Sequence, residues 1–93
     1  MGVQDLDSQA ARTDTGVLLQ SLDRETMRLE FAGHTMNLPV ERGLLSYGFY
    51  LPLSPQWSDG APISPNDLTV IKQAIVEIQK HWGFHVDFLV LET

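Results

Sequence analysis

Apolar residues recur with a helical period in one stretch of this chain, between Ser64 and Gly83. They share one face of a helix because they are three or four residues apart, while polar residues occupy the opposite face. The apolar positions are Leu68, Ile71, Ile75, Ile78 and Trp82. Ser64 can cap the helix, Pro65 suits its first turn, and Gly83 can end it in a left-handed turn. The pattern predicts one long amphipathic helix whose apolar face needs a sheet to cover it.

Alternation with a period of two predicts four strands before this helix and one after it. The five segments are 16–22, 27–31, 35–40, 44–53 and 84–92. The second and third form a hairpin that turns at Gly33 and His34. Pro39 cannot donate a ladder hydrogen bond, so we expect the third strand to be an edge there or to end early. The last strand is apolar on both faces, which predicts an interior strand or an edge that a partner covers.

The order of these elements, β-β-β-β-α-β, predicts an α+β fold. We expect a four-stranded antiparallel meander, one long helix packed on the sheet, and a closing C-terminal strand. Residues 1–14 are polar and lack periodicity, so they should form a flexible N-terminal arm. Residues 15–93 should form a single domain, because a chain of 93 residues is long enough for one hydrophobic core and too short for two.

Acidic residues outnumber basic ones by twelve to six, which gives a net charge of −6. This charge repels nucleic acids and anionic membrane surfaces, so we expect neither as a partner. No apolar run approaches the length of about 18 residues that crosses a membrane, and we expect a cytoplasmic protein. The chain has no cysteine, which excludes disulfide bonds, thiolate metal sites and a cysteine nucleophile.

The three histidines offer little for a metal or a catalytic site. His81 and His85 are four residues apart, but Gly83 should end the helix between them and so destroy the geometry of a helical metal site. His85 and Asp87 share one face of the last strand, where a rim ion pair or hydrogen bond is the simplest interpretation. The chain also lacks nucleophile-elbow and glycine-rich phosphate motifs. We therefore expect no enzyme activity, no metal and no cofactor.

The loop of residues 52–62 is long for a connection in a small domain, and loops of this length often carry function. Trp57 at its centre has two interpretations, a lid on the core or an anchor for a binding partner, and Tyr50 shares this ambiguity. The candidate partner-binding residues are Trp57, Asp59, Tyr50, Asp23 and Glu25. The acidity of the chain has two interpretations, solubility or complementarity to a basic partner. In the second, the acidic residues among these candidates would supply the negative charge.

From Tyr47 to Phe88 the order of features is similar to that of a known family. An aromatic strand with the sequence GFYL leads to Ser54, to Trp57 in a proline-containing loop, and then to PIS, a helix ending in WG, and a closing strand. This order resembles the small immunity proteins of bacterial polymorphic-toxin systems, in particular the immunity protein 74 family, and the likeness covers about residues 15–92. The resemblance implies an α+β cytoplasmic protein that binds and neutralises a cognate toxin domain.

The sequence thus favours a small acidic binding protein that neutralises a bacterial toxin by stoichiometric binding. Two other classes stay open. A homo-oligomeric structural or adaptor domain would pair an edge strand or the last strand across a two-fold axis, as a homodimer. A small-molecule binding domain would need a polar-lined pocket between the helix and the sheet.

Overall fold

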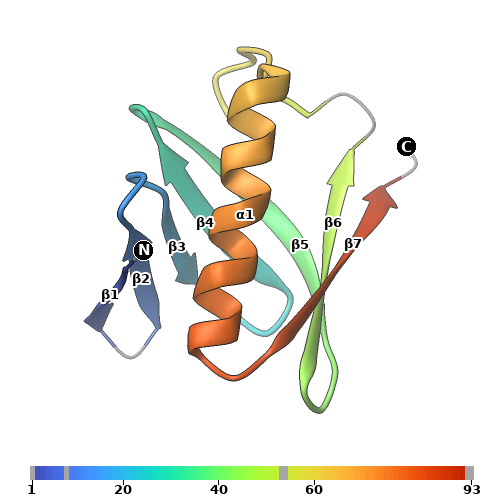
Figure 1. Ribbon diagram of the computed structural model, residues 1–93. Coiled ribbons are helices and arrows are strands. Elements are labelled where there is room, and N and C mark those ends of the chain that lie inside the picture. The colour runs from blue at the N-terminus through green and yellow to red at the C-terminus, as the bar shows by residue number, and fades with distance from the viewer. Residues whose placement is uncertain (1, 8, 53–54, 92–93) are drawn as a thin grey trace.

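The computed structural model describes residues 2–7, 9–52 and 55–91, which form one curled sheet and one helix. The strands are β1 (Val3–Asp7), β2 (Ala10–Thr13), β3 (Leu18–Ser21), β4 (Thr26–Phe31), β5 (His34–Arg42), β6 (Ser46–Pro52) and β7 (His85–Leu91), and the helix is α1 (Pro65–His81). The strands lie in sequence order, antiparallel from β1 to β6, while β7 is parallel to β6 because α1 carries the chain back across the sheet. Figure 1 shows α1 on one face of this sheet.

The predicted four-stranded meander with a closing strand is wrong, although the broader α+β class holds. The described residues form a sheet of seven strands, because two strands precede the first predicted one. The last strand, β7, is an edge strand beside β6 and not an interior strand. Periodicity within a segment identifies a strand but does not show its neighbours, so the parallel pairing of β7 was not predictable from it.

The predicted flexible arm of residues 1–14 is also wrong, because β1 and β2 form a hairpin within it. Ala10, Ala11 and Thr13 of β2 are buried, and both strands contact α1. Strands of five and four residues show little alternation, and alanine is a poor strand former. The hairpin is therefore held by tertiary contacts that local patterns do not reveal.

Asp5 attaches β1 to the end of α1. Its Oδ2 lies 2.9 Å from His81 Nε2, and its Oδ1 accepts a hydrogen bond of 3.0 Å from Trp82 Nε1. The hydrogen bond with His81, and then the one from Trp82, hold the pKa of Asp5 below its usual value. We call these three residues the Asp5 clasp. Through the clasp, the first strand of the sheet reaches the C-terminal end of the helix.

The helix begins and ends as its sequence predicts. At the N-terminal end, Ser64 Oγ accepts a hydrogen bond of 3.1 Å from Asp67 N, which satisfies a free amide of the first turn. At the C-terminal end, Gly83 has a φ of 91°, and this left-handed turn lets Phe84 N donate back to Gln79 O at 2.7 Å. No helix in the described residues is long and apolar enough to cross a membrane.

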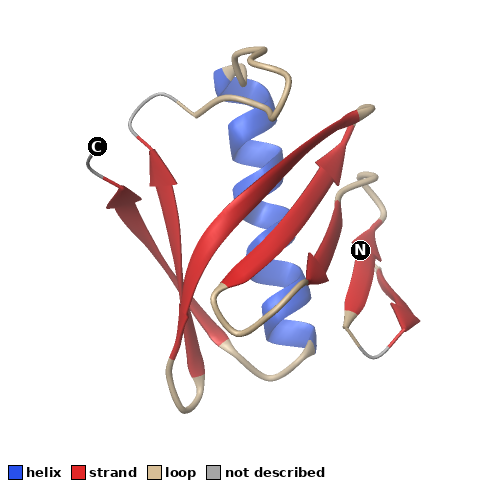
Figure 2. Ribbon diagram, turned by 180° about the vertical axis from the view of Figure 1, so that it is seen from behind, coloured by secondary structure: helices blue, strands red, loops and turns tan. Residues whose placement is uncertain are grey.

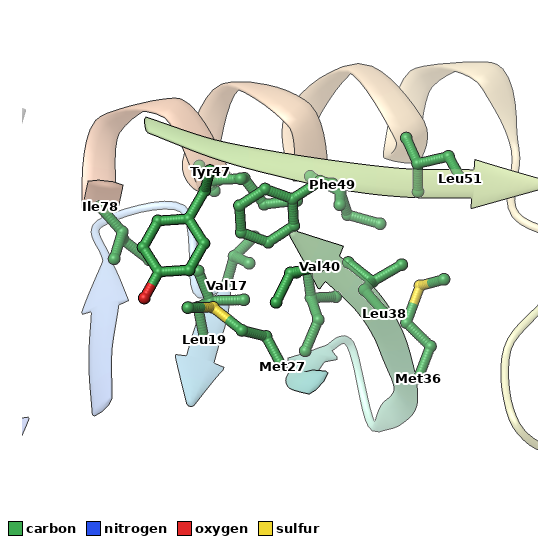
Figure 3. Close-up of a cluster of buried hydrophobic side chains, with 14 of the residues drawn as sticks. Val17, Leu19, Met27, Met36, Leu38, Val40, Tyr47, Phe49, Leu51 and Ile78 are labelled. Carbon is green, nitrogen blue, oxygen red and sulfur yellow. The ribbon is translucent and has the colours of Figure 1, made fainter. Parts of the chain in front are cut away.

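The hydrophobic core lies between the predicted apolar face of α1 and the inner face of the sheet, as Figure 3 shows. Ile71, Ile75 and Ile78 of the helix are fully buried, and Leu68 and Trp82 are half-buried. The sheet contributes alternate residues, among them Leu19, Met27, Leu29, Met36, Leu38, Val40, Tyr47, Phe49 and Leu51. Because burying one such side chain stabilises by about 1.5–3 kcal/mol, this cluster is the main source of stability.

Gln79 is the exception on the buried side of α1. It is completely buried, although apolar periodicity does not include this position. Its Nε2 donates to Met27 Sδ at 3.4 Å, while its Oε1 has no hydrogen-bond partner among the described residues. An unpaired buried oxygen costs about 1–3 kcal/mol. The core therefore contains one polar group that opposes folding.

We expect Ile75→Ala to be among the most destabilising single substitutions, because it opens a cavity at the centre of the buried helix face. The free energy of unfolding, measured by urea denaturation, should fall by about 2–5 kcal/mol. The matched control is Val76→Ala on the next residue, which is 41% exposed and should cost less than about 1 kcal/mol. Equal losses for the two variants would mean that another face of the helix is buried.

The Asp5 clasp should make stability depend on pH under acidic conditions. Because the folded-state pKa of Asp5 is lowered, the clasp contributes fully above the unfolded pKa of about 3.9 and is lost as pH falls through the folded pKa. We expect Asp5→Asn to lower the melting temperature at neutral pH, and the difference from the native chain to shrink below about pH 4. Thermal denaturation followed by circular dichroism measures this, with Glu30→Gln as control. A melting temperature that Asp5→Asn leaves unchanged at every pH would contradict the role of the clasp.

Candidate functional site

The sheet opens between β5 and β6. Their pairing covers only residues 40–42 of β5 and 47–49 of β6. Among the described residues, positions 34–39 of β5 pair with β4 alone, and positions 50–52 of β6 pair with β7 alone. Figure 2 shows the two strands diverging from their paired ends. Pro39 is the first residue beyond the paired stretch, so the predicted edge at this proline is confirmed.

A hollow of about 950 Å³ lies beside this opening. The turn between β3 and β4, the end of β5 and Tyr50 of β6 form its walls. The polar residues that line it are Arg24, Glu25, Thr26, Glu41, Arg42 and Tyr50. We call it the Tyr50 hollow. A mixture of an aromatic residue with charges of both signs on an open surface is more typical of a protein interface than of an enclosed small-molecule pocket.

A hydrogen bond fixes the phenol of Tyr50 against β5. Its hydroxyl donates to Glu41 Oε2 at 2.9 Å. This hydrogen bond and the nearby negative charge favour the neutral phenol, which raises the pKa of Tyr50. On the same strand, the guanidinium of Arg42 lies 5.4 Å from the ring centre of Phe84 and 5.8 Å from that of Tyr47. The hydrogen bond between Glu41 and Tyr50 therefore orders one wall of the hollow. The guanidinium of Arg42 makes cation–π contacts with Tyr47 and Phe84.

Trp57 closes the core and does not present its ring on the surface. It is only 5% exposed, and its ring stacks on that of His34 with a centroid distance of 5.4 Å. Ser58 N donates to Thr35 O at 2.8 Å, which attaches the loop to the start of β5. Figure 1 shows this loop above the N-terminal end of α1. Of the two interpretations of Trp57, the structure supports the lid.

Asp59 holds the turn of the same loop. Its Oδ1 accepts a hydrogen bond of 3.0 Å from Ala61 N, and its Oδ2 lies 2.9 Å from His34 Nδ1. The hydrogen bond from Ala61, followed by the one with His34, lowers the pKa of Asp59. The carboxylate is still exposed, so it joins the loop to β5 and also contributes negative charge to the surface.

The structure brings two of the five predicted partner-binding residues to one place. Glu25 and Tyr50 line the Tyr50 hollow. Asp23 lies in the turn beside it, where its Oδ1 accepts a hydrogen bond of 2.8 Å from Glu25 N. Asp59 and Trp57 lie near His34, at the opposite end of β5 from the hollow. Partner binding by these residues stays a prediction, and Trp57 could support it only from within the core.

Sequence reasoning missed an exposed apolar turn, of which Leu44 lines the hollow. Leu44 and Leu45 were assigned to a predicted strand, but β6 begins at Ser46 and the two leucines belong to the turn before it. They are 92% and 69% exposed. The available signal was their position directly after a polar turn, before the alternation of β6 begins. Exposed leucines beside a hollow are typical of an interaction surface.

The histidines of the described part of the chain lie in pairs with acidic residues, not in larger clusters. The described residues contain no group of three or more histidine or acidic side chains that could hold a metal ion. Each histidine instead lies near one carboxylate, in the pairs His34–Asp59 at 2.9 Å, His81–Asp5 at 2.9 Å and His85–Asp87 at 3.4 Å. The predicted contact between His85 and Asp87, as an ion pair or a hydrogen bond, is present at the rim of the sheet. The His85–Asp87 pair is the most exposed of the three, and a solvent-accessible pair of this kind contributes little to stability.

Comparisons with known proteins identified no relative of this chain. Neither family models nor curated proteins nor solved structures match it. The Tyr50 hollow and the net charge are the observations on which a function can be based.

The wall formed by Tyr50 and Glu41 can be tested by titration. In a Tyr47→Phe background, Tyr50 is the remaining tyrosine, and its ultraviolet absorbance reports its ionisation. We expect its pKa to lie above the usual value of about 10, and Glu41→Gln to lower it because the substitution removes the negative charge. Glu30→Gln is the control and should have no effect. An unchanged pKa in Glu41→Gln would mean that the hydrogen bond is absent in solution.

Proposed function

We propose that this chain is a binding protein that neutralises a cognate bacterial toxin by occupying it, as the immunity proteins that it resembles do. The Tyr50 hollow is the observation that carries this proposal. It combines an ordered phenol, two carboxylates from Glu25 and Glu41, and an exposed apolar turn on one open surface. Aromatic anchors beside polar groups are typical of residues that supply binding energy in protein interfaces.

Charge supports a basic partner. The chain carries a net charge of −6, and Asp23 adds a third exposed carboxylate beside the hollow. A field of this sign accelerates the approach of a positively charged surface, and the effect weakens as salt is raised. Association of the two proteins should therefore be slower at high ionic strength, while the dissociation rate depends more on the buried contacts.

Contact energy would come from the tyrosine and the two leucines. The hydrogen bond to Glu41 already restricts Tyr50, so binding loses less side-chain entropy than it would for a free side chain. Burying Leu44 or Leu45 completely would each contribute up to about 1.5–3 kcal/mol. The walls of the hollow belong largely to paired strands, and such a surface should change little on binding.

This mode of action requires no reaction. The inhibited partner should be released chemically intact, because shape and charge complementarity are sufficient to block it. A protein of this kind would act in the cytoplasm of the cell that also makes the toxin. Dimerisation of the chain and small-molecule binding are the competing functions, and the experiment below distinguishes dimerisation from the proposal.

The test begins with recovery of a partner from the native host on the immobilised chain. The recovered protein is then expressed in a second host, with and without this chain, and growth is measured. We expect the partner to arrest growth and co-expression of the native chain to restore it. The double variant Glu25→Lys with Tyr50→Ala should weaken binding by at least about tenfold and fail to protect.

The matched control is Glu30→Lys, which makes the same charge change on an exposed residue at the other end of β4. It should bind and protect like the native chain, with both variants shown to be folded by circular dichroism. Full protection by the double variant would remove the Tyr50 hollow from the proposal. Recovery of this chain alone would favour a homo-oligomeric adaptor, and a non-toxic partner would contradict the immunity function.

A further inference from the structure

The last strand, β7, has one unpaired side. It pairs with β6, and no other strand in the described part of the chain lies beside it. His85 N donates to Leu45 O of the β6 side at 2.9 Å. Because backbone groups of successive strand residues point to alternate sides, the amides and carbonyls of Val86 and Phe88 face away from β6. These groups can form the ladder hydrogen bonds of an added strand.

Two hollows lie between this edge and α1. One, of about 390 Å³, is lined by Val76 and Lys80 of the helix together with Phe84 and Val86. The other, of about 230 Å³, is lined by Leu68, Lys72, Phe88 and Val90 among others. The aromatic and aliphatic side chains of β7 are only partly buried here. A strand added to β7 would thus lie beside an apolar groove that receives every second side chain.

Both lysines of this acidic chain flank the groove. They are Lys72 and Lys80, and the Nζ of Lys72 lies 5.5 Å from the ring centre of Phe88. Eight helical residues separate them, a rise of about 12 Å. In an extended strand, four residues cover about 13 Å. Two side chains four residues apart in an added strand would therefore match the spacing of the two lysines. The side chain halfway between those two would face Val76.

We propose that the β7 edge binds an extended acidic segment of a partner protein, which adds to the sheet as a further strand. Acidic residues four positions apart would face Lys72 and Lys80, with an apolar residue between them. This surface is separate from the Tyr50 hollow, so it goes beyond the function proposed above. A second copy of the chain fits less well, because two-fold pairing of β7 strands would bring Lys72 of each copy toward Lys80 of the other.

The opposite edge of the sheet, strand β1, is not suited to strand addition. Asp5 and Asp7 lie on β1, and the register of β1 with β2 shifts between them. Charges and irregular register are features that protect an edge from strand addition. An acidic segment would also be repelled there, so β7 is the edge that fits this partner.

The probe is a fluorescein-labelled heptapeptide with glutamate at its second and sixth positions, valine at its fourth, and threonine elsewhere. The control peptide has lysine in place of glutamate. Both are titrated with the full chain and followed by fluorescence anisotropy at low and at physiological salt. We expect the acidic peptide to bind at least about tenfold more tightly than the basic one, with weaker binding at higher salt. Equal affinity of the two peptides, or no binding of either, would overturn the proposal.

Two pairs of variants locate the site. The double variant Lys72→Glu with Lys80→Glu should weaken binding of the acidic peptide at least about tenfold. The control, Arg12→Glu with Arg28→Glu, makes the same charge change on exposed residues away from β7. It should weaken binding of this peptide far less. Val90→Pro removes an amide of the unpaired side at a residue that is 59% exposed, and it should weaken binding more than Val90→Ala.

A folded charge-reversed chain that binds the acidic peptide as the native chain does would contradict the proposal. Sedimentation in the absence of peptide gives an independent outcome. A dimer that Val90→Pro dissociates and Val90→Ala does not would assign the β7 edge to self-association instead. A monomer that binds the acidic peptide through both lysines would support the acidic partner segment.

Discussion

The structure depends on burial of one face of α1 inside a sheet that curls around it. Ile71, Ile75 and Ile78 are fully buried in this arrangement, and a flat sheet could not reach both sides of the helix. Curling brings β1 and β7, the two edges of the sheet, into contact with α1. The Asp5 clasp fixes one edge by two hydrogen bonds, while the other edge is held by aromatic side chains. The buried oxygen of Gln79, which lacks a hydrogen-bond partner in the described part of the chain, costs free energy. This cost is smaller than the stabilisation from the apolar side chains buried around it.

Local signals were sufficient for the elements whose stability is local. The cap at Ser64, the apolar stripe and the turn at Gly83 are all contained in α1 and its flanks, so the helix was predictable. The hairpin of β4 and β5 was predictable for the same reason. The hairpin of β1 and β2 was not, because it depends on contacts such as the one between Asp5 and Trp82, which are 77 positions apart. The parallel pairing of β7 with β6 is equally non-local.

The candidate site likewise combines residues that local signals identify with features that depend on non-local contacts. Residue type alone identified Tyr50 and Glu25 as candidates, and the structure places them in one hollow. The hollow itself arises where β5 and β6 separate, which no single segment encodes. Trp57 was ambiguous because a tryptophan serves equally well in a core and in an interface. Only its packing against His34 distinguishes the two. Leu44 was missed because an apolar residue next to a strand is normally counted as part of it.

The crossover from β6 through α1 to β7 has a consequence for how the chain folds. The other neighbouring strands follow one another closely in the sequence. Paired residues such as Tyr50 and Leu89, in contrast, are 39 positions apart. Closing a loop of this length costs more entropy than forming a hairpin, so the pairing of β6 with β7 should be a late event. On the ribosome, β7 is also made after all the other described elements. Until it emerges, the nascent chain exposes the edge of β6 and part of its apolar inner face, and chaperones or neighbouring chains would meet that surface first.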